Sequence, residues 1–295
     1  MSHILEQIKK EKKYNMFSSG HLIFILISVA FITAGTILSR RYIPDINQML
    51  KICLVIGIVS EVIKVFSVAN IVPVVTPVVL NGASGIEFDY KAIGPYTPYI
   101  NAEHLPFELC SIQLVLIPVA LLLKDSLKRN SLYAIMYATQ IIGGMLAVLL
   151  PFLVTEYDSV SSMFLSPRVW QFFLYHSMII TLGLYIGGSK EAGIRFEHWK
   201  TAVIGILMMD IPSFYLNSIM SKPVYLNGKL AGVSYRVNYF SSYVNPIGLN
   251  LTKKWQWILY LCVRFMIAII CVYSLFLFKR KLTDSKESVD DAYEQ

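Results

Sequence analysis

Long apolar runs separated by short polar segments dominate this chain. Seven of the runs are long enough to cross the hydrocarbon core of a bilayer as helices, which takes about 20 residues for a thickness of roughly 30 Å. We place these spans at residues 20–38, 48–69, 106–123, 131–154, 170–188, 200–220 and 255–278. The pattern predicts an all-α fold, a polytopic membrane helix bundle with seven transmembrane spans.

Composition supports a membrane protein without a large soluble domain. Hydrophobic residues make up 55% of the 295 residues and charged residues only 15%, whereas soluble domains carry about 25% charged residues. The first span lacks a small-residue cleavage site and is too long for a signal-peptide core, so we expect it to remain as a span. The predicted organisation is a basic N-terminal tail (1–19), a membrane domain (20–279) and a polar tail (280–295) that we expect to be disordered.

The two long loops both fall on one face of the predicted bundle. They are residues 70–105 and 221–254. In the second loop, "VYLNGKLAGV" at 224–233 places Asn227-Gly228 between short β-prone runs, which indicates a short β-hairpin. The first loop has β-branched runs and Asn81-Gly82, but its prolines limit it to irregular or edge strand. Long ordered loops on one face are typical of lids and binding loops.

The direction of insertion is only weakly encoded. Basic residues divide almost equally between the two faces, so the positive-inside rule scarcely distinguishes them. We expect a multi-pass protein of the cell membrane whose long-loop face is extracellular, because part of the charge on that face lies in a long loop of the kind that translocates regardless of charge.

Two side chains on otherwise apolar spans have the chemistry of a catalytic pair. Cys110 lies about 6 Å below the start of the span at 106–123, and His176 about 9 Å below Trp170 in the span at 170–188. Both spans begin on the long-loop face, so the thiol and the imidazole lie at similar depth. A thiol near a helix start and a histidine is favoured as thiolate, the nucleophilic form. The alternatives are a buried hydrophobic cysteine and a histidine that only makes structural hydrogen bonds.

Carboxylates within the predicted spans are a second candidate site. Glu61 and Asp210 are costly at this depth and are functional hypotheses by default. Glu61 and Lys64 are i, i+3 neighbours, and Asp210 could pair with Arg264 of the last span. The two carboxylates therefore either line an internal chamber or belong to two structural ion pairs.

Other polar residues near the same face could support such a site. Gln113 shares a helical face with Cys110 and could donate to an oxyanion. Glu108 is two residues from Cys110, so on a helix it points away from the thiol, and it could pair with His104 at i, i+4. His21, at the start of the first span, could contact lipid headgroups.

The sequence offers little for metals, disulfides or nucleic acids. The four cysteines form no CxxC and no Cys/His spacing, so we predict neither a zinc site nor a disulfide framework. The net charge of +7 suggests contact with anionic headgroups rather than nucleic acid. No metal or organic cofactor is required by the chemistry above.

Several short motifs in order resemble one known family. They are "MFSSGHL" at 16–22, "LPFELCSIQ" at 105–113, "FFLYHSMII" at 172–180 and "VNYFSSYVNP" at 237–246. Together with the Glu61-bearing span they resemble the YwaF-like integral membrane proteins, which are similar to transmembrane protein 164, an acyltransferase that makes ether-linked phosphatidylethanolamines. The resemblance implies a seven-span fold with Cys110 as nucleophile and His176 as its base.

The leading hypothesis is a membrane lipid acyltransferase or acyl-ester hydrolase acting on phospholipids or lysophospholipids. Cys110 would attack the acyl ester, His176 would move the proton, and Gln113 or Asn238, beside Tyr239 in the last motif, would stabilise the oxyanion. The alternative is a small-molecule or lipid binding and transport protein with its site at Glu61, Asp210 and Arg264. A non-catalytic scaffold is the third interpretation. Donor, acceptor and oligomeric state are left open by the sequence.

Overall fold

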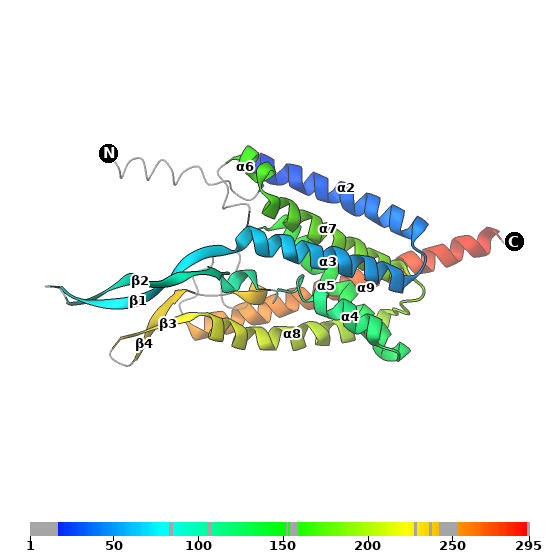
Figure 1. Cartoon of the computed structure of the whole chain (residues 1–295). Coiled ribbons are helices and arrows are strands. Elements are labelled where there is room, and N and C mark those ends of the chain that lie inside the picture. The colour runs from blue at the N-terminus through cyan, green and yellow to red at the C-terminus, as the bar shows by residue number, and fades with distance from the viewer. Residues whose placement is uncertain are drawn as a thin grey trace.

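The computed structural model describes residues 17–82, 85–105, 108–151, 153, 159–226, 229–235, 238–241 and 253–293. This part of the chain is mostly helical, with two small β-hairpins at one end of the helix bundle (Figure 1). The main helices are α2 (Ser19–Tyr42), α3 (Ile46–Val68), α4 (Gln113–Leu122), α5 (Ser126–Leu149), α7 (Pro167–Gly188), α8 (Trp199–Met220) and α9 (Lys254–Tyr293), with a short α6 (Val160–Leu165).

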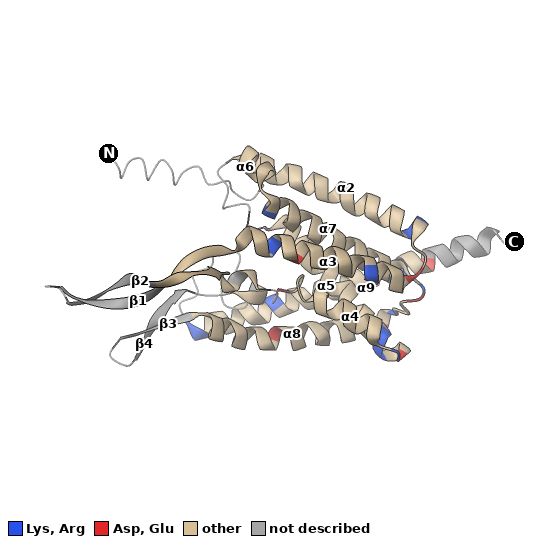
Figure 2. Ribbon diagram, in the orientation of Figure 1, with Lys and Arg blue, Asp and Glu red and all other residues tan. Residues whose placement is uncertain are grey.

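The helices begin where the sequence supplies caps. The side chain of Asp125 accepts hydrogen bonds from the backbone N–H groups of Leu127 and Lys128 at the start of α5, and Asp45 caps α3 in the same way. Pro167 occupies the first turn of α7, where its missing N–H is not needed. Charged residues lie mostly near helix ends, and few interrupt the middle of a helix (Figure 2). In a membrane, charges at helix ends lie near water, where they cost least.

Five segments of the described residues are long and apolar enough to cross a membrane. They are Ser19–Tyr42, Ser126–Leu149, Pro167–Gly188, Phe196–Met220 and Lys254–Asp284. The chain is therefore a multi-pass membrane protein. The predicted span at 48–69 folds as α3, which carries the Glu61–Lys64 ion pair and is not among the five.

The predicted span at 106–123 is much shorter as a helix. Helix α4 begins only at Gln113, and the residues from Glu108 to Ile112 form turns. The backbone N–H of Gln113 donates to Cys110 O, while the side-chain Nε2 of Gln113 donates to Leu109 O at 3.2 Å. The glutamine side chain thus replaces a backbone donor, which allows the chain to depart from a helix there. Pro106 and Phe107 lie outside the described residues.

Both long loops contain antiparallel hairpins that extend from the same end of the bundle (Figure 1). Strands β3 (Lys222–Leu226) and β4 (Lys229–Tyr235) pair so that Leu226 faces Lys229, which confirms the predicted hairpin; Asn227 and Gly228 themselves lie outside the described residues.

The first long loop is more regular than predicted. It pairs β1 (Asn70–Gly82) with β2 (Gly85–Tyr99) over nearly its whole length. Each strand of a two-stranded sheet is an edge, so prolines are tolerated where their nitrogen faces outward. The pairing register of the two strands shifts between Pro73 and Val75. Asn81 and Gly82 belong to the strand, where they pair with Ile86 and Gly85.

Helix α7 lies at the centre, packed against α2, α3 and α5. Close approach of α5 and α7 depends on small residues of α5. A Cβ added at Gly144 would lie 2.5 Å from Cγ1 of Ile180 on α7, and one at Gly143 would lie 3.2 Å from Cδ2 of Leu109. These glycines allow α5 to contact both α7 and the turn before α4.

The C-terminal tail differs from its prediction. Helix α9 continues to Tyr293, so residues 280–293 are helical rather than disordered. Arg280 Nε lies 3.7 Å from Asp284 Oδ2, an i, i+4 pair that supports the extension. The basic tail predicted at 1–19 lies outside the described residues up to position 16.

Candidate functional site

A cavity of about 730 Å³, here called the chamber, lies within the bundle toward the hairpin end. Its volume is in the range of sites that hold one small organic ligand, about 300–1,000 Å³. Helices α3, α5, α7, α8 and α9 contribute to its wall, together with the turn before α4 and the segment 238–240. Its charged, histidine and cysteine lining residues are Glu61, Lys64, His104, Glu108, Cys110, Arg168, His176, Asp210 and Arg264.

Cys110 lines the chamber from the turn before α4. It is half-buried and free of any disulfide. Sequence reasoning placed Cys110 in the first turns of a helix, but α4 begins three residues later, at Gln113. The thiol is therefore presented by a turn whose carbonyl groups are held by side chains. One of these is Tyr175 of α7, whose hydroxyl donates to Cys110 O at 2.9 Å.

His176 lines the same chamber from the buried helix α7, with only 4% of its surface exposed. Its Nδ1 lies 2.6 Å from the backbone oxygen of Phe172, four residues earlier. A carbonyl can only accept, so Nδ1 carries the proton and Nε2 carries the lone pair. Within the described part of the chain, Nε2 is buried without a hydrogen-bond partner. An imidazole in this tautomer is ready to accept a proton from a group in the chamber.

Tyr175 and His176 make α7 the organising element of the thiol–imidazole arrangement. The two residues are adjacent in sequence, and the rings meet at 80° with centroids 5.5 Å apart. Tyr175 holds the backbone of Cys110, and the next residue, His176, lines the cavity that Cys110 also lines. Sequence reasoning missed Tyr175. The only available signal was a tyrosine beside a histidine in an apolar span.

Asp210 and Arg264 form an ion pair on the α8–α9 side of the chamber. Arg264 Nη2 donates to Asp210 Oδ2 at 2.5 Å, and Asp210 is 2% exposed. Arg264 Nη1 also donates to the backbone oxygen of Phe240, and the backbone N–H of Phe240 donates to Glu108 Oε2 at 3.3 Å. Phe240 adopts φ +57°, a left-handed backbone conformation that is unusual for a large residue. The segment 238–240 thus connects α9 to the turn that carries Cys110.

Glu108 differs from its prediction. On a regular helix it would point away from Cys110, but in the turn both residues line the chamber. Glu61 and Lys64 form the other predicted ion pair, with Lys64 Nζ 2.5 Å from Glu61 Oε1. Both predicted ion pairs are confirmed, and all four of their residues also line the chamber. The two interpretations of the carboxylates, structural pairing and chamber lining, are therefore compatible.

The remaining predicted residues divide into lining and supporting positions. Asn238 and Tyr239 line the chamber, and Tyr239 is also bound through its backbone to Asn217 of α8. Gln113 is fully buried outside the lining. Its Nε2 donates to Leu109 O and to Thr139 Oγ1, and its Oε1 accepts from Gln140. An amide used in this way supports the turn and is not available to an oxyanion.

His21 lies away from the chamber lining. It is fully buried where α2 begins, with Nε2 2.9 Å from Val148 O and Nδ1 accepting from the N–H of Phe17. Both ring nitrogens are engaged, so His21 joins the start of α2 to the end of α5 rather than contacting headgroups. Among the described residues, no group of three metal-ligating side chains comes together.

The comparison with known families identifies the group to which this arrangement belongs. The sequence profile of the TMEM164 family matches residues 16–278, most of the chain. The chain belongs to the TMEM164 family. All the residues that line the chamber fall within the matched region of this family. No curated protein and no solved structure matches the chain.

Proposed function

We propose that this TMEM164-family protein is a seven-span lipid acyltransferase or acyl-ester hydrolase with Cys110 as nucleophile and His176 as base. The observation that carries the proposal is the buried, unpartnered Nε2 of His176 in a cavity that Cys110 also lines. A buried nitrogen with a lone pair and no partner is costly in a structural role. It is useful as a general base.

The reaction has two acyl transfers. His176 Nε2 takes the Cys110 thiol proton, and the thiolate attacks the ester carbonyl of a phospholipid to form a tetrahedral oxyanion. Collapse breaks the C–O bond, and the imidazolium returns its proton to the departing lysolipid alkoxide. A second lipid hydroxyl, or water, then loses its proton to His176 and attacks the thioester. The C–S bond breaks, and the imidazolium returns its proton to the departing Cys110 thiolate. Attack by a lipid gives transfer, and attack by water gives hydrolysis.

The charged residues have supporting roles in this proposal. Arg264 and Arg168 give the chamber two guanidinium groups that could face a phosphate headgroup. Asn238 is a side-chain amide that lines the chamber, and it replaces Gln113 as the candidate oxyanion donor. Our proposed topology places the hairpin end outside the cell, with the seven helices α2–α5 and α7–α9 as spans.

The test is acyl transfer by purified protein in lipid nanodiscs. A phospholipid with an isotope-labelled acyl chain is the donor and a lysophospholipid is the acceptor, with products followed by mass spectrometry. We expect labelled product from the wild type and from Cys262→Ala, a control at a lipid-exposed cysteine outside the chamber. Cys110→Ala should give none, and His176→Gln should give much less than the wild type. Product formation that survives Cys110→Ala would refute the mechanism.

A binding or transport protein with its site at Glu61, Asp210 and Arg264 is the rival proposal, supported by the two ion pairs that line the chamber. The same nanodisc experiment separates the two. If the protein is a transporter, Cys110→Ala retains lipid binding or lipid movement. In that case the wild type itself forms no labelled product. Charge changes at Asp210 would then reduce binding more than the cysteine change does.

A further inference from the structure

The chamber changes character along its depth. On α9, Arg264 forms the ion pair with Asp210, and one and two turns further from the hairpins Ala268 and Val272 line the same chamber. At 1.5 Å per residue Val272 lies about 12 Å beyond Arg264 along the helix. On α8, Ile206 stands one turn beyond Asp210 in the same direction. The chamber is therefore polar toward the hairpins and apolar toward its deeper end.

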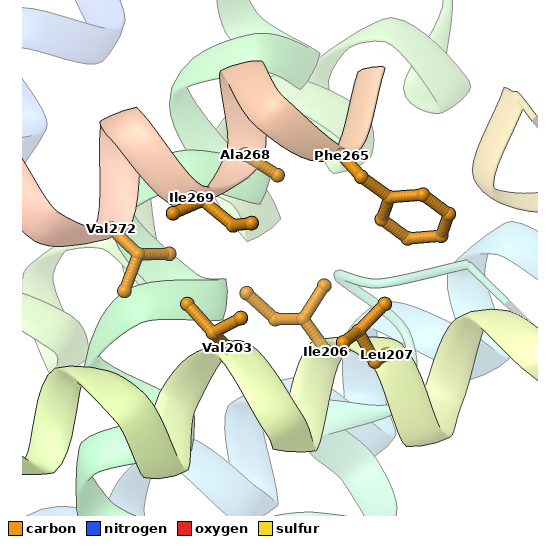
Figure 3. Close-up of a pocket in the computed structure, with 7 residues that line it drawn as sticks. All are labelled: Val203, Ile206, Leu207, Phe265, Ala268, Ile269 and Val272. Atoms are coloured by element: carbon orange, nitrogen blue, oxygen red, sulfur yellow. The ribbon is translucent and has the colours of Figure 1, made fainter. Parts of the chain in front are cut away.

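A narrow apolar gap adjoins the deeper end. It lies between α8 and α9 and has seven lining residues, all apolar, which face one another across the two helices (Figure 3). Four of them, Ile206, Phe265, Ala268 and Val272, also line the chamber. The gap has a volume of about 10 Å³, about the size of one water-sized probe. The chamber and the gap are therefore neighbours that share these four side chains.

The surroundings of the gap are hydrocarbon. Of the membrane-crossing windows, only 17% of the one on α8 and 11% of the one on α9 is buried inside the protein, against 72% for α7. Side chains next to the gap, such as Ile267 and Ile270, are more than half exposed. At this depth an exposed apolar side chain contacts lipid tails, not water. The molecule available to enter between α8 and α9 is an acyl chain.

We propose that the α8–α9 gap is the lateral entrance and binding groove for one acyl chain of a membrane lipid. This inference rests on the proposed function, because it assigns the tail of the lipid whose ester would reach Cys110 and His176. The chain lies along Ile206, Ala268 and Val272, and the ester and headgroup lie toward Asp210 and Arg264. Ala268 has the smallest side chain in the gap, so its size sets how much of a chain is admitted.

Two substitutions change the groove in opposite directions. Ala268→Phe fills the gap, and each methylene it displaces should weaken binding of the acyl chain about fourfold. Val272→Ala enlarges the deeper end and should favour longer chains. Ile267→Phe is the matched control, because it adds the same ring to the neighbouring residue, which is 55% exposed to lipid.

The experiment uses a phospholipid with a photoreactive diazirine in its acyl chain, added to nanodiscs that hold the full chain with Cys110→Ala. Crosslinked residues are mapped by mass spectrometry, so this arm does not depend on catalysis. We expect crosslinks at α8 and α9 residues of the gap, strongly reduced by Ala268→Phe and retained with Ile267→Phe and Val272→Ala. Crosslinks confined to other helices, or unchanged by Ala268→Phe, would overturn the groove.

A second arm separates this inference from the proposed function. Nanodiscs with Cys110 intact are given donors of shorter and longer acyl chain in competition. A shift toward shorter chains with Ala268→Phe and toward longer chains with Val272→Ala supports the groove. Transfer that proceeds with no shift in either variant refutes the groove and leaves the catalytic pair standing. Groove crosslinks without any transfer by the wild type refute the catalytic pair alone.

Discussion

Removing the hydroxyl of Tyr175 should slow reactions of Cys110 without emptying the chamber. In Tyr175→Phe the backbone oxygen of Cys110 loses its 2.9 Å hydrogen bond and retains the longer bond from the backbone N–H of Gln113, at 3.3 Å. A net hydrogen bond of this kind contributes about 0.5–1.5 kcal/mol. If that energy holds the thiol in its reactive position, the rate at Cys110 should fall by a factor of roughly 2 to 13.

The same helix provides the control. The hydroxyl of Tyr185 donates to Ile43 O at 2.6 Å at the far end of α7, and Tyr185 does not line the chamber. Tyr185→Phe removes a comparable bond, so it should lower thermal stability by a similar amount. It should leave the reactivity of Cys110 unchanged.

The assay measures alkylation of Cys110 by a lipid-like electrophile, with the modified peptide quantified by mass spectrometry over time. Thermal unfolding of each variant in the same lipid is measured alongside. Slower alkylation in Tyr175→Phe and wild-type alkylation in Tyr185→Phe are the expected results. Equal alkylation rates in the two variants, at equal loss of stability, would refute the positioning role of Tyr175.

Two further predictions concern stability. Asp210→Asn leaves Arg264 without its charged partner and should destabilise the protein by about 3–5 kcal/mol, measured as lost yield and a lower unfolding temperature. The double swap of Asp210→Arg with Arg264→Asp should recover part of this loss. Unchanged stability in Asp210→Asn would contradict the buried ion pair. Gly144→Ala places a Cβ 2.5 Å from Ile180 Cγ1 and should cost about 1–3 kcal/mol of stability, which Ile180→Ala in the same chain should relieve. No relief would mean that the α5–α7 contact is not the cause.

Most of the helices could be predicted from sequence because lipid imposes strict demands on them. A segment in hydrocarbon must satisfy its own backbone, so a long apolar run has few alternatives to a helix. The run at 170–188 became Pro167–Gly188, and the run at 200–220 became Trp199–Met220. The predicted helix ends differ from the observed ones by a few residues, because capping residues set the ends and hydropathy does not detect them.

The segment around Cys110 could not be predicted in the same way. Its apolar pattern is that of a helix, and a helix was expected from 106. The chain departs from that pattern because the side chain of Gln113 binds Leu109 O in place of a backbone N–H, while Thr139 and Gln140 of α5 hold the same amide. These partners lie more than 20 residues away in sequence. No local pattern contains that information.

The ion pairs could be predicted from the sequence, whereas the contacts around Phe240 could not. Glu61 with Lys64 is a neighbour pair on one helix, and Asp210 with Arg264 follows from the need of a buried charge for an opposite one, so both pairs could be anticipated. The bonds of Phe240 to Glu108 and Arg264 use its backbone atoms. Every residue type has the same backbone groups, so the sequence does not show which of them accept or donate such bonds. The contacts of Phe240 and the hydrogen bond from Tyr175 to Cys110 O were therefore missed.

In the proposed mechanism Cys110 carries the acyl group as a thioester formed with help from His176. The most direct measurement is the release of nitrophenol from a long-chain nitrophenyl ester by the purified protein, with intact mass recorded in parallel. We predict a burst equal to the amount of protein and an adduct of one acyl chain on Cys110 that neutral hydroxylamine removes. Both should disappear in Cys110→Ala, and the burst should slow in His176→Gln. An adduct of the same size on Cys110→Ala, or steady release with no adduct on the wild type, would contradict the account.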